Sequence, residues 1–518
     1  MITPTPSKLL ALFMALAMAW PAAPALAQGS LPALGDSASD DLDIGDERRL
    51  GEQIMRDIRR DPAFLDDPVL QNYVQGLWQP LVASGRQLGH IGPDLERAYP
   101  WELFLVRDAS VNAFALPGGH VGVHLGLIAM TTHADELASV MAHELVHVTQ
   151  RHIARSIGSG KRGSMVSVAA MMLGLLLASR AGSADAAQAA VLGGQAAMIQ
   201  GQLNFSRDME READRIGYGM LETAGYSPRS MASMFEKLSV ANRLNDSGSF
   251  PYLRSHPLTT ERIAEARARV PDGTPPVEAS LVHALMRVRA SALMDPTTAT
   301  LRRLQEAPLG TLPQERLAGL YQRALVSTRL KDAAAARESL GPLLEAAARP
   351  EVPPEARRVV HWLAVEVALG AGPAPQMAEL AQMSSLLPES DGQRPAVLLR
   401  AQAVRATLPA AGADAPARLR RSLEELQSWV AEHPSDAGAW HQLSLTAAAA
   451  GQPVRALRAD AEMQAALGDL PGAVDRLRTA RRADGTNEAI ELQVIDARLR
   501  ALQGQLRLLM QEETGRGR

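Results

Sequence analysis

The sequence predicts a mainly α-helical protein, with an N-terminal α+β domain that holds a small β-sheet and a C-terminal region built from helices alone. Three observations predict this fold class. Alanine, leucine, arginine and glutamate, which favour helices, abound, whereas aromatic residues make up only 4% of the chain. Short strand-like segments occur at 101–106 and 121–126. From residue 277 onwards, helix-length segments follow one another with glycine or proline between them.

The length, composition and charge of the chain narrow the classes of function. The 518 residues are enough for two or three domains, and 46% hydrophobic with 21% charged residues is ordinary for a soluble globular protein. A formal net charge of -4, without basic runs interleaved with aromatics, argues against nucleic acid as a partner. The chain has no cysteine, so any bound metal must be held by histidine and carboxylate side chains.

The first segment, 1–27, has the pattern of an export signal. Lys8 supplies the positive start, residues 9–20 the apolar core, and Ala25-Leu-Ala27 the small-residue cleavage site. The alternative is a membrane anchor that is retained, for which the apolar core is short. Residues 28–43 then form a flexible N-terminus. We therefore expect the mature protein in the periplasm of a Gram-negative bacterium.

The segment that follows is expected to build the small sheet between helices at 44–60 and 68–84 and the later helices. The residues that link the two strand-like segments, Asn112, Ala113, Phe114 and Ala115, are candidates for an edge strand. An extended substrate can add to such a strand through main-chain hydrogen bonds, which gives cleavage with loose sequence preference. The alternative is an ordinary hairpin.

The strongest chemical signal is His143-Glu144-Leu-Val-His147, within a helix expected over 135–156. Residues four apart on a helix lie about 40° apart around its axis, so both imidazoles project from one face and can bind one metal ion. Zinc is the usual occupant of such a pair. Glu144 flanks this face, where a general base for a metal-bound water belongs. On the same continuous helix, His152 lies about 140° from His147 and is not expected to join the ligands.

A third ligand must come from elsewhere, and the helix expected over 207–221 offers one. Glu210 and Asp214 lie on one face of that helix, so Glu210 can bind the ion while Asp214 accepts a hydrogen bond from a ligand histidine. Glu212 faces away from Asp214. The alternative is a solvated helix whose carboxylates pair with neighbouring arginines. Between the two helices, the uncharged run 165–178 is either a buried helix or an interfacial or substrate-gating segment.

The C-terminal half carries a repeat signal. Helices expected at 228–242 and 261–270 are followed by the Pro/Gly-rich boundary in 271–280. In the region 281–515, Gly451 and Gly468 repeat at half of a 34-residue period, and Trp440, Leu443, Ala456 and Ala473 fall close to tetratricopeptide positions. Stacked repeats of this kind present a concave surface. The alternative is a generic helical bundle.

These motifs together resemble one family. Four motifs occur in the order seen in BepA-like periplasmic metalloproteases. They are the segment Asn112–Gly119, HELVHVTQRH, a later ExEADRIG and the segment Ser255–Arg262. Those proteins belong to the zinc peptidase family that also contains HtpX and the CAAX-prenyl endopeptidases. The resemblance is strong over 44–270 and holds only in kind for the C-terminal half. It implies a gluzincin-like metalloprotease domain at 44–270 and a tetratricopeptide-like (TPR-like) domain at 281–515.

The resemblance also implies residue roles. It implies one Zn²⁺ ion bound by His143, His147 and Glu210, with Glu144 as the base and Asp214 behind the ligands. His256 would then occupy the open zinc position and hold the enzyme inactive; the alternative is a loop-capping residue. Arg262 either stabilises the oxyanion of the tetrahedral intermediate or pairs with a carboxylate.

The function implied by the resemblance is that of a periplasmic zinc endopeptidase of outer-membrane quality control. Its substrates would be misassembled β-barrel proteins, and its TPR-like domain would dock on the barrel-assembly machinery and support a chaperone-like role. One alternative is a chaperone or assembly factor that rarely cuts. Another is a membrane-surface protease that makes a peripheral membrane contact through 165–178. The residues alone support only a protease joined to a peptide-binding scaffold.

Overall fold

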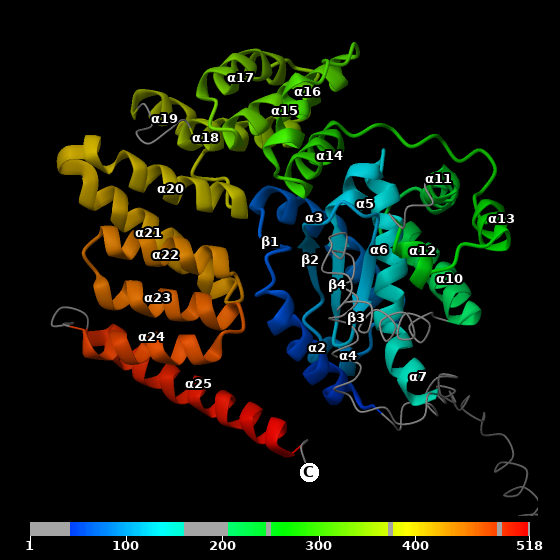
Figure 1. Ribbon diagram of the computed structural model, residues 1–518, viewed down its shortest axis with the longest axis horizontal. Helices are drawn as coiled ribbons and strands as arrows, with labels where there is room; N and C mark the ends of the chain where they lie inside the picture. Colours follow the sequence, from blue (N-terminus) through cyan, green and yellow to red (C-terminus); the bar gives the residue numbers. More distant parts are fainter. Residues whose placement is uncertain (1–41, 160–205, 245–249, 371–376, 484–488, 516–518) are drawn as a thin grey trace, which may run out of the picture.

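The computed structural model describes residues 42–159, 206–244, 250–370, 377–483 and 489–515. The export signal predicted at 1–27 and the uncharged run 165–178 lie outside these residues. Within the described residues the predicted fold class is confirmed, because a small sheet in the N-terminal part is followed by helices alone. Figure 1 shows the sheet enclosed by helices on one side of the molecule and the later helices on the other. In this part of the chain, no helix combines the length and apolar character needed to cross a membrane.

The sheet has four strands in the order β1-β2-β4-β3, namely β1 (Phe64–Leu65), β2 (Glu102–Val106), β4 (His120–His124) and β3 (Ala113–Leu116). The central strands β2 and β4 are parallel, and each outer strand pairs antiparallel with its neighbour. All of β4 and most of β2 are buried, as expected for parallel strands covered on both faces. The two predicted strands are thus the centre of the sheet, and β3 forms one edge.

The N-terminal helices surround this sheet: α2 (Ile44–Ile58), α3 (Pro68–Gln87), α4 (Pro93–Ala98), α5 (Leu125–Met130), α6 (Ala134–Thr149), α7 (His152–Ser159), α10 (Arg207–Thr223), α11 (Arg229–Leu244), α12 (Tyr252–Ser255) and α13 (Thr260–Ala268). Helix α6 lies between the sheet and α10 (Figure 1). Every residue from Glu136 to Thr149 is buried, so α6 is a central helix enclosed on all sides.

The prediction of one continuous helix over 135–156 was wrong. Helix α6 ends at Thr149, and Arg151 has a φ of 52°, in the left-handed region that a right-handed helix cannot contain. The Arg151 side chain donates to Glu47 of α2 at 2.6 Å, which ties this turn to the first helix. The chain resumes as a separate helix, α7, at His152. The angle inferred for His152 on a continuous helix therefore does not apply.

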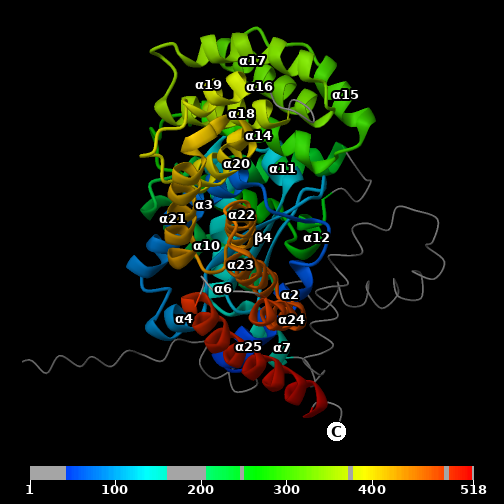
Figure 2. The same ribbon diagram turned by 90° about the vertical axis from the view of Figure 1, so that its left-hand side faces the viewer.

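The helices of the C-terminal half are α14 (Leu281–Met294), α15 (Thr298–Glu306), α16 (Pro313–Arg329), α17 (Ala333–Ala347), α18 (Pro354–Gly370), α19 (Met377–Ser384), α20 (Arg394–Ala411), the short 3-10 helix η2 (Gly412–Asp414), α21 (Ala415–Glu432), α22 (Ala437–Ala449), α23 (Pro453–Ala466), α24 (Leu470–Arg482) and α25 (Ala489–Gly515). Figures 1 and 2 both show α22 to α25 stacked one after another. The turns after α22 and α23 contain Gly451 (φ 72°) and Gly468 (φ 81°). Glycine adopts this left-handed conformation without steric cost, which explains the spacing seen in the sequence.

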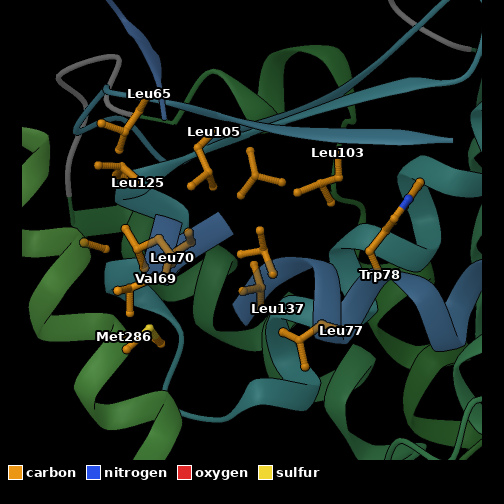
Figure 3. Packing of buried hydrophobic residues seen from close by; sticks show 14 of the residues in the cluster. Leu65, Val69, Leu70, Leu77, Trp78, Leu103, Leu105, Leu125, Leu137 and Met286 are labelled. Carbon is orange, nitrogen blue, oxygen red and sulfur yellow. The ribbon is translucent and has the colours of Figure 1, made fainter. Parts of the chain in front are cut away.

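The main hydrophobic core crosses the boundary expected at 271–280. Buried apolar side chains form one cluster from α2 through the sheet to α20. Figure 3 shows Met286 of α14 directed at the same interior as Val69 and Leu70 of α3. Helix α14 packs against α5 and α3 as well as against α16. The first helices of the C-terminal half are therefore continuous with the core of the N-terminal domain.

A buried arginine joins the same two regions. Arg289 of α14 donates two hydrogen bonds of 2.8 Å to Asp67, the residue that caps the N-terminus of α3. It also donates to Glu366 of α18 at 2.7 and 2.9 Å and to Tyr321 of α16 at 2.9 Å. A buried charge is tolerated only when it is paired in this way. Further along, Arg394 of α20 binds Asp66 at 2.6 and 2.9 Å, so α20 also contacts the N-terminal domain.

Candidate metal centre

Four buried side chains from three parts of the chain converge at α6, the helix that packs against the sheet. His143 and His147 come from α6, Glu210 from α10, and His256 from the residue that follows α12. One ligand atom from each of them lies within 4.8 Å of all the others. The structure thus brings the predicted ligand triad together and adds His256 to the cluster.

The local sequence explains how α10 presents its carboxylate. Ser206 caps this helix by accepting a hydrogen bond from the Met209 backbone N–H at 3.2 Å, which places Glu210 in the first turn. The buried face of α10 includes Glu210, Ala213, Asp214 and Gly217, at the spacing of one helical stripe. This face packs against α6, so both carboxylates point at the two imidazoles.

The spacing of the ligand atoms fits a small divalent ion. Glu210 Oε2 lies 3.5 Å from His143 Nε2, and Glu210 Oε1 lies 3.5 Å from His147 Nε2. The two Nε2 atoms are 3.0 Å apart. Around a tetrahedral ion with ligands at about 2.1 Å, neighbouring ligand atoms lie about 3.4 Å apart. The donor set of imidazole nitrogens and one carboxylate therefore matches a metal site in both chemistry and size.

Asp214 and Arg262 support this cluster from behind. Asp214 Oδ1 lies 3.0 Å from His143 Nδ1, so it can accept the proton of that nitrogen and leave Nε2 for an ion. Arg262 donates to both Asp214 oxygens, at 2.7 and 2.8 Å, and forms an ion pair with Glu210 in which its Nη1 lies 2.7 Å from Oε2. It also donates to the Pro257 carbonyl at 2.9 Å. In this structure the Arg262 guanidinium is therefore paired with carboxylates, which is one of the two alternatives considered for it.

The charges in the cluster act strongly on one another. Burial alone would raise the pKa of Glu210, but the nearby charge of His256 and hydrogen bonds from His143 and His256 hold it well below its ordinary value. Burial opposes protonation of His143, yet hydrogen bonds to Asp214 and Glu210 raise its pKa to about 9. Burial and the charge of His143 lower the pKa of His147 well below the usual range. The carboxylates therefore make the cluster attractive to a cation.

Glu144 lies next to the cluster without belonging to it. It is fully buried, and its Oε1 is 3.5 Å from His256 Nε2. Neither of its carboxylate oxygens has a hydrogen-bond partner among the described residues. Burial raises the pKa of this carboxyl group. A buried carboxylate with so few hydrogen-bonding partners is unusual, and it suits a proton-accepting group aimed at a bound molecule.

His152 and Glu212, which were not expected to take part in the site, lie on the side of His147 away from the cluster. His152 Nδ1 is 2.9 Å from His147 Nδ1, and His152 Nε2 is 3.1 Å from Glu212 Oε2. Glu212 also accepts a hydrogen bond from Arg155 at 3.0 Å. Burial lowers the pKa of His152 to about 4, so the ring is neutral at ordinary pH. The contact of His152 with His147 was not predicted, because the motif helix was expected to continue beyond Thr149, where α6 ends.

The remaining candidates lie on the sheet. Asn112 precedes β3, and Ala113, Phe114 and Ala115 lie within it. Within the described residues β3 pairs with β4 alone, so it forms the edge nearest α6. His120 and His124 of β4 are buried and bind Glu102 and Ser110, at 3.0 and 2.9 Å. These two histidines therefore have structural partners outside the metal cluster.

Comparison with known proteins agrees with this geometry. The family model for Peptidase family M48 matches residues 90–270, the part of the chain that contains the whole cluster. A beta-barrel assembly-enhancing protease of Yersinia pestis is 30% identical over 458 residues, which cover 88% of each chain. The chain belongs to the M48 peptidase family.

Two further relatives in this M48 group match shorter segments. A putative beta-barrel assembly-enhancing protease of Vibrio cholerae is 39% identical over 257 residues, 49% of this chain and 51% of the relative. The beta-barrel assembly-enhancing protease of Escherichia coli K12 is 34% identical over 329 residues, 62% of this chain and 65% of the relative. The matches thus span between half and two thirds of these two relatives. The predicted resemblance to BepA-like M48 metalloproteases is confirmed.

Proposed function

We propose that this chain is a zinc endopeptidase that hydrolyses peptide bonds of unfolded or misassembled polypeptides. The observation that carries the proposal is the cluster of His143, His147 and Glu210 with the buried carboxylate of Glu144 beside it. Nitrogen and carboxylate ligands in a tetrahedral arrangement are those that zinc prefers, and catalytic zinc sites use three protein ligands and one open position. When bound, zinc polarises the scissile carbonyl and lowers the pKa of a water molecule.

The protein groups then divide the remaining work. Glu144 accepts a proton from the attacking water and delivers it to the leaving amine. Asp214 fixes the tautomer of His143 through its 3.0 Å contact with Nδ1. Arg262 holds Asp214 in place with charge-assisted hydrogen bonds and Glu210 with an ion pair. Because these groups are buried, their attraction is less weakened by water than on the surface.

The edge strand β3 supports a place for the substrate. An extended peptide that pairs with Ala113–Leu116 would run alongside α6, next to Glu144. Pairing through backbone groups needs no particular side chains, so it suits an enzyme that acts on many unfolded chains. We propose that Asn112, Ala113, Phe114 and Ala115 contribute this binding strand.

His256 supports a resting state in which the site is closed. Its Nδ1 lies 2.9 Å from Glu210 Oε1, and its Nε2 lies 3.5 Å from Glu144 Oε1, so the ring stands between ligand and base. A fourth protein ligand in this position would displace the water that must attack. We propose that His256 restrains the enzyme until a substrate displaces it.

Replacing His256 by alanine should therefore raise basal proteolysis. We expect an increase of about 10-fold or more in the cleavage of an unfolded test protein, equivalent to about 1.4 kcal/mol of removed restraint. Zinc content should be measured in the same preparations. Unchanged or lower cleavage with zinc fully bound would contradict the restraint. A matched control is the exposed His441 on α22, whose replacement by alanine should leave cleavage unchanged.

The related proteins point to a biological setting. Because they are beta-barrel assembly-enhancing proteases, we propose that the substrates here are misassembled outer-membrane β-barrel proteins. The export signal predicted at 1–27 agrees with a periplasmic location. The tetratricopeptide-like helices α22 to α24 support docking of the helical half on the barrel-assembly machinery.

A second candidate function, that of a chaperone, is favoured by hollows along α21. One of about 450 Å³ lies between α21 and α22 and is lined in part by Leu419, Leu423 and Arg455. Another of about 450 Å³ lies between α20 and α21 and is lined in part by Arg400 and Ser422. Mixed apolar and polar linings of this kind suit segments of unfolded polypeptide. Binding at α21 and cleavage at the metal centre are compatible within one protein.

Metal removal tests the proposed function directly. The purified mature chain should contain one zinc ion, and dialysis against a chelator should abolish its cleavage of an unfolded β-barrel protein. Adding back zinc should restore cleavage. Cleavage that persists after complete loss of metal would overturn the proposal. Binding of the unfolded protein in the absence of metal, with no cleavage under any condition, would favour the chaperone.

A further inference from the structure

We propose that His152, held by Glu212, is a positioning residue that fixes the tautomer and the ring orientation of His147. The inference rests on the proposed zinc site and adds a second support to it. His152 is fully buried at the start of α7, and Glu212 lies on the opposite side of α10 from Asp214. Neither residue contacts the ion's position, so the role is to orient a ligand rather than to bind metal.

The first step is the contact between two ring nitrogens. His152 Nδ1 and His147 Nδ1 are 2.9 Å apart, and two unprotonated nitrogens would repel each other at this distance. One of them must therefore carry the proton. If His147 Nε2 gives its lone pair to zinc while the ring is neutral, its proton is on Nδ1. His147 then donates, and His152 Nδ1 must accept.

The second step sets the tautomer of His152. A neutral ring that accepts at Nδ1 carries its proton on Nε2. This nitrogen lies 3.1 Å from Glu212 Oε2, which is a pure acceptor when ionised. Arg155 binds the same oxygen at 3.0 Å and stabilises the charge of Glu212. The chain from Glu212 through His152 to His147 therefore has a donor facing an acceptor at each contact.

The two zinc-facing imidazoles are thus supported in different ways. His143 Nδ1 faces the Asp214 carboxylate directly, at 3.0 Å, whereas His147 Nδ1 faces the ring of His152, which in turn faces the Glu212 carboxylate. A direct carboxylate places a full negative charge next to the ligand, while a neutral ring fixes its orientation with less charge. The arrangement therefore holds both rings and limits the negative charge close to the ion, which preserves the ion's ability to polarise a carbonyl.

The turn at Arg151 makes this contact possible. On a continuous helix the His152 ring would point away from His147, but the left-handed Arg151 (φ 52°) interrupts the helix between the two residues. The hydrogen bond from Arg151 to Glu47 holds the turn. A left-handed arginine is unfavourable by itself and persists only where the surroundings enforce it. Here it brings the next residue onto the ligand.

Zinc affinity measured by chelator competition tests the inference. His152→Leu removes both hydrogen-bonding atoms and should weaken zinc binding about 10- to 100-fold, the usual effect of losing such a partner. His152→Gln keeps one acceptor and one donor and should stay within about threefold of the wild-type affinity. The control is His441→Leu on the exposed face of α22, which should bind zinc as the wild type does.

A second readout separates positioning from simple packing. Melting temperatures should be measured with and without zinc for each variant. If His152 acts on the ligand, His152→Leu should reduce the rise in melting temperature that zinc produces. An equal zinc affinity and zinc-induced rise in His152→Leu and the wild type would overturn the inference. Failure of the wild type itself to bind zinc would instead overturn the proposed function.

Discussion

Replacing Glu144 by glutamine should lower kcat for peptide hydrolysis by about 10²- to 10⁴-fold, the range that a general base contributes. The amide has the shape of the carboxyl group but cannot take a proton from water. Glu144 makes no hydrogen bond to the side chain of any ligand residue, so zinc should remain bound in full. Steady-state cleavage of an unfolded protein, together with metal analysis, checks both expectations.

The matched control is Glu222→Gln at the exposed C-terminal end of α10, which should retain wild-type activity. Wild-type cleavage by Glu144→Gln would show that another group accepts the proton. The same variant separates the two candidate functions in cells. Full rescue of outer-membrane assembly by Glu144→Gln would show that binding, rather than cleavage, is the principal role.

Replacing Glu210 by alanine should remove zinc from the protein. This variant loses the only carboxylate of the cluster and leaves the buried charge of Arg262 with one fewer partner. Asp214→Asn, which removes a partner of a ligand rather than a ligand, should weaken zinc binding about 10- to 100-fold. The loss of zinc affinity in Glu210→Ala should be larger than this. Metal analysis and chelator competition on the three proteins check the order.

The control for metal loss through misfolding is the folded state without zinc. The circular dichroism spectrum of Glu210→Ala should match that of the chelator-treated wild type. Stoichiometric zinc in purified Glu210→Ala would contradict the ligand role, because no other described residue besides His143, His147 and His256 belongs to the cluster.

Local patterns predicted the parts of the fold and site that depend on neighbouring residues. The two central strands and the helices on either side follow from apolar periodicity, and the pairs in α6 and α10 follow from helical spacing. The edge strand β3 was placed in the right segment, whereas the two-residue β1 has too little sequence to carry a pattern.

What escaped prediction depends on tertiary contacts. Nothing near Arg151 signals a left-handed residue, because the partner that holds it, Glu47, lies on another helix. The contact between His152 and His147 therefore escaped prediction, although His152 is not among the clustered ligand residues, as expected. Likewise, nothing in the local sequence distinguishes the buried Arg289 from an exposed arginine on a helix surface. Its burial depends on Asp67 and Glu366, which come from the residue before α3 and from another helix. Pairings between residues so far apart in the chain have no local signature.

The core that runs beneath the helical half has a practical consequence for dissecting the protein. A fragment that stops after Val270 would expose the apolar side of α3 and α5 that α14 covers in the full chain. It would also leave Asp67 without its partner Arg289. Such a fragment would combine exposed apolar surface with an unpaired buried acid, and both favour aggregation. A catalytic fragment meant for crystallisation or assay should therefore extend at least through α20, which belongs to the same core and carries Arg394, the partner of Asp66.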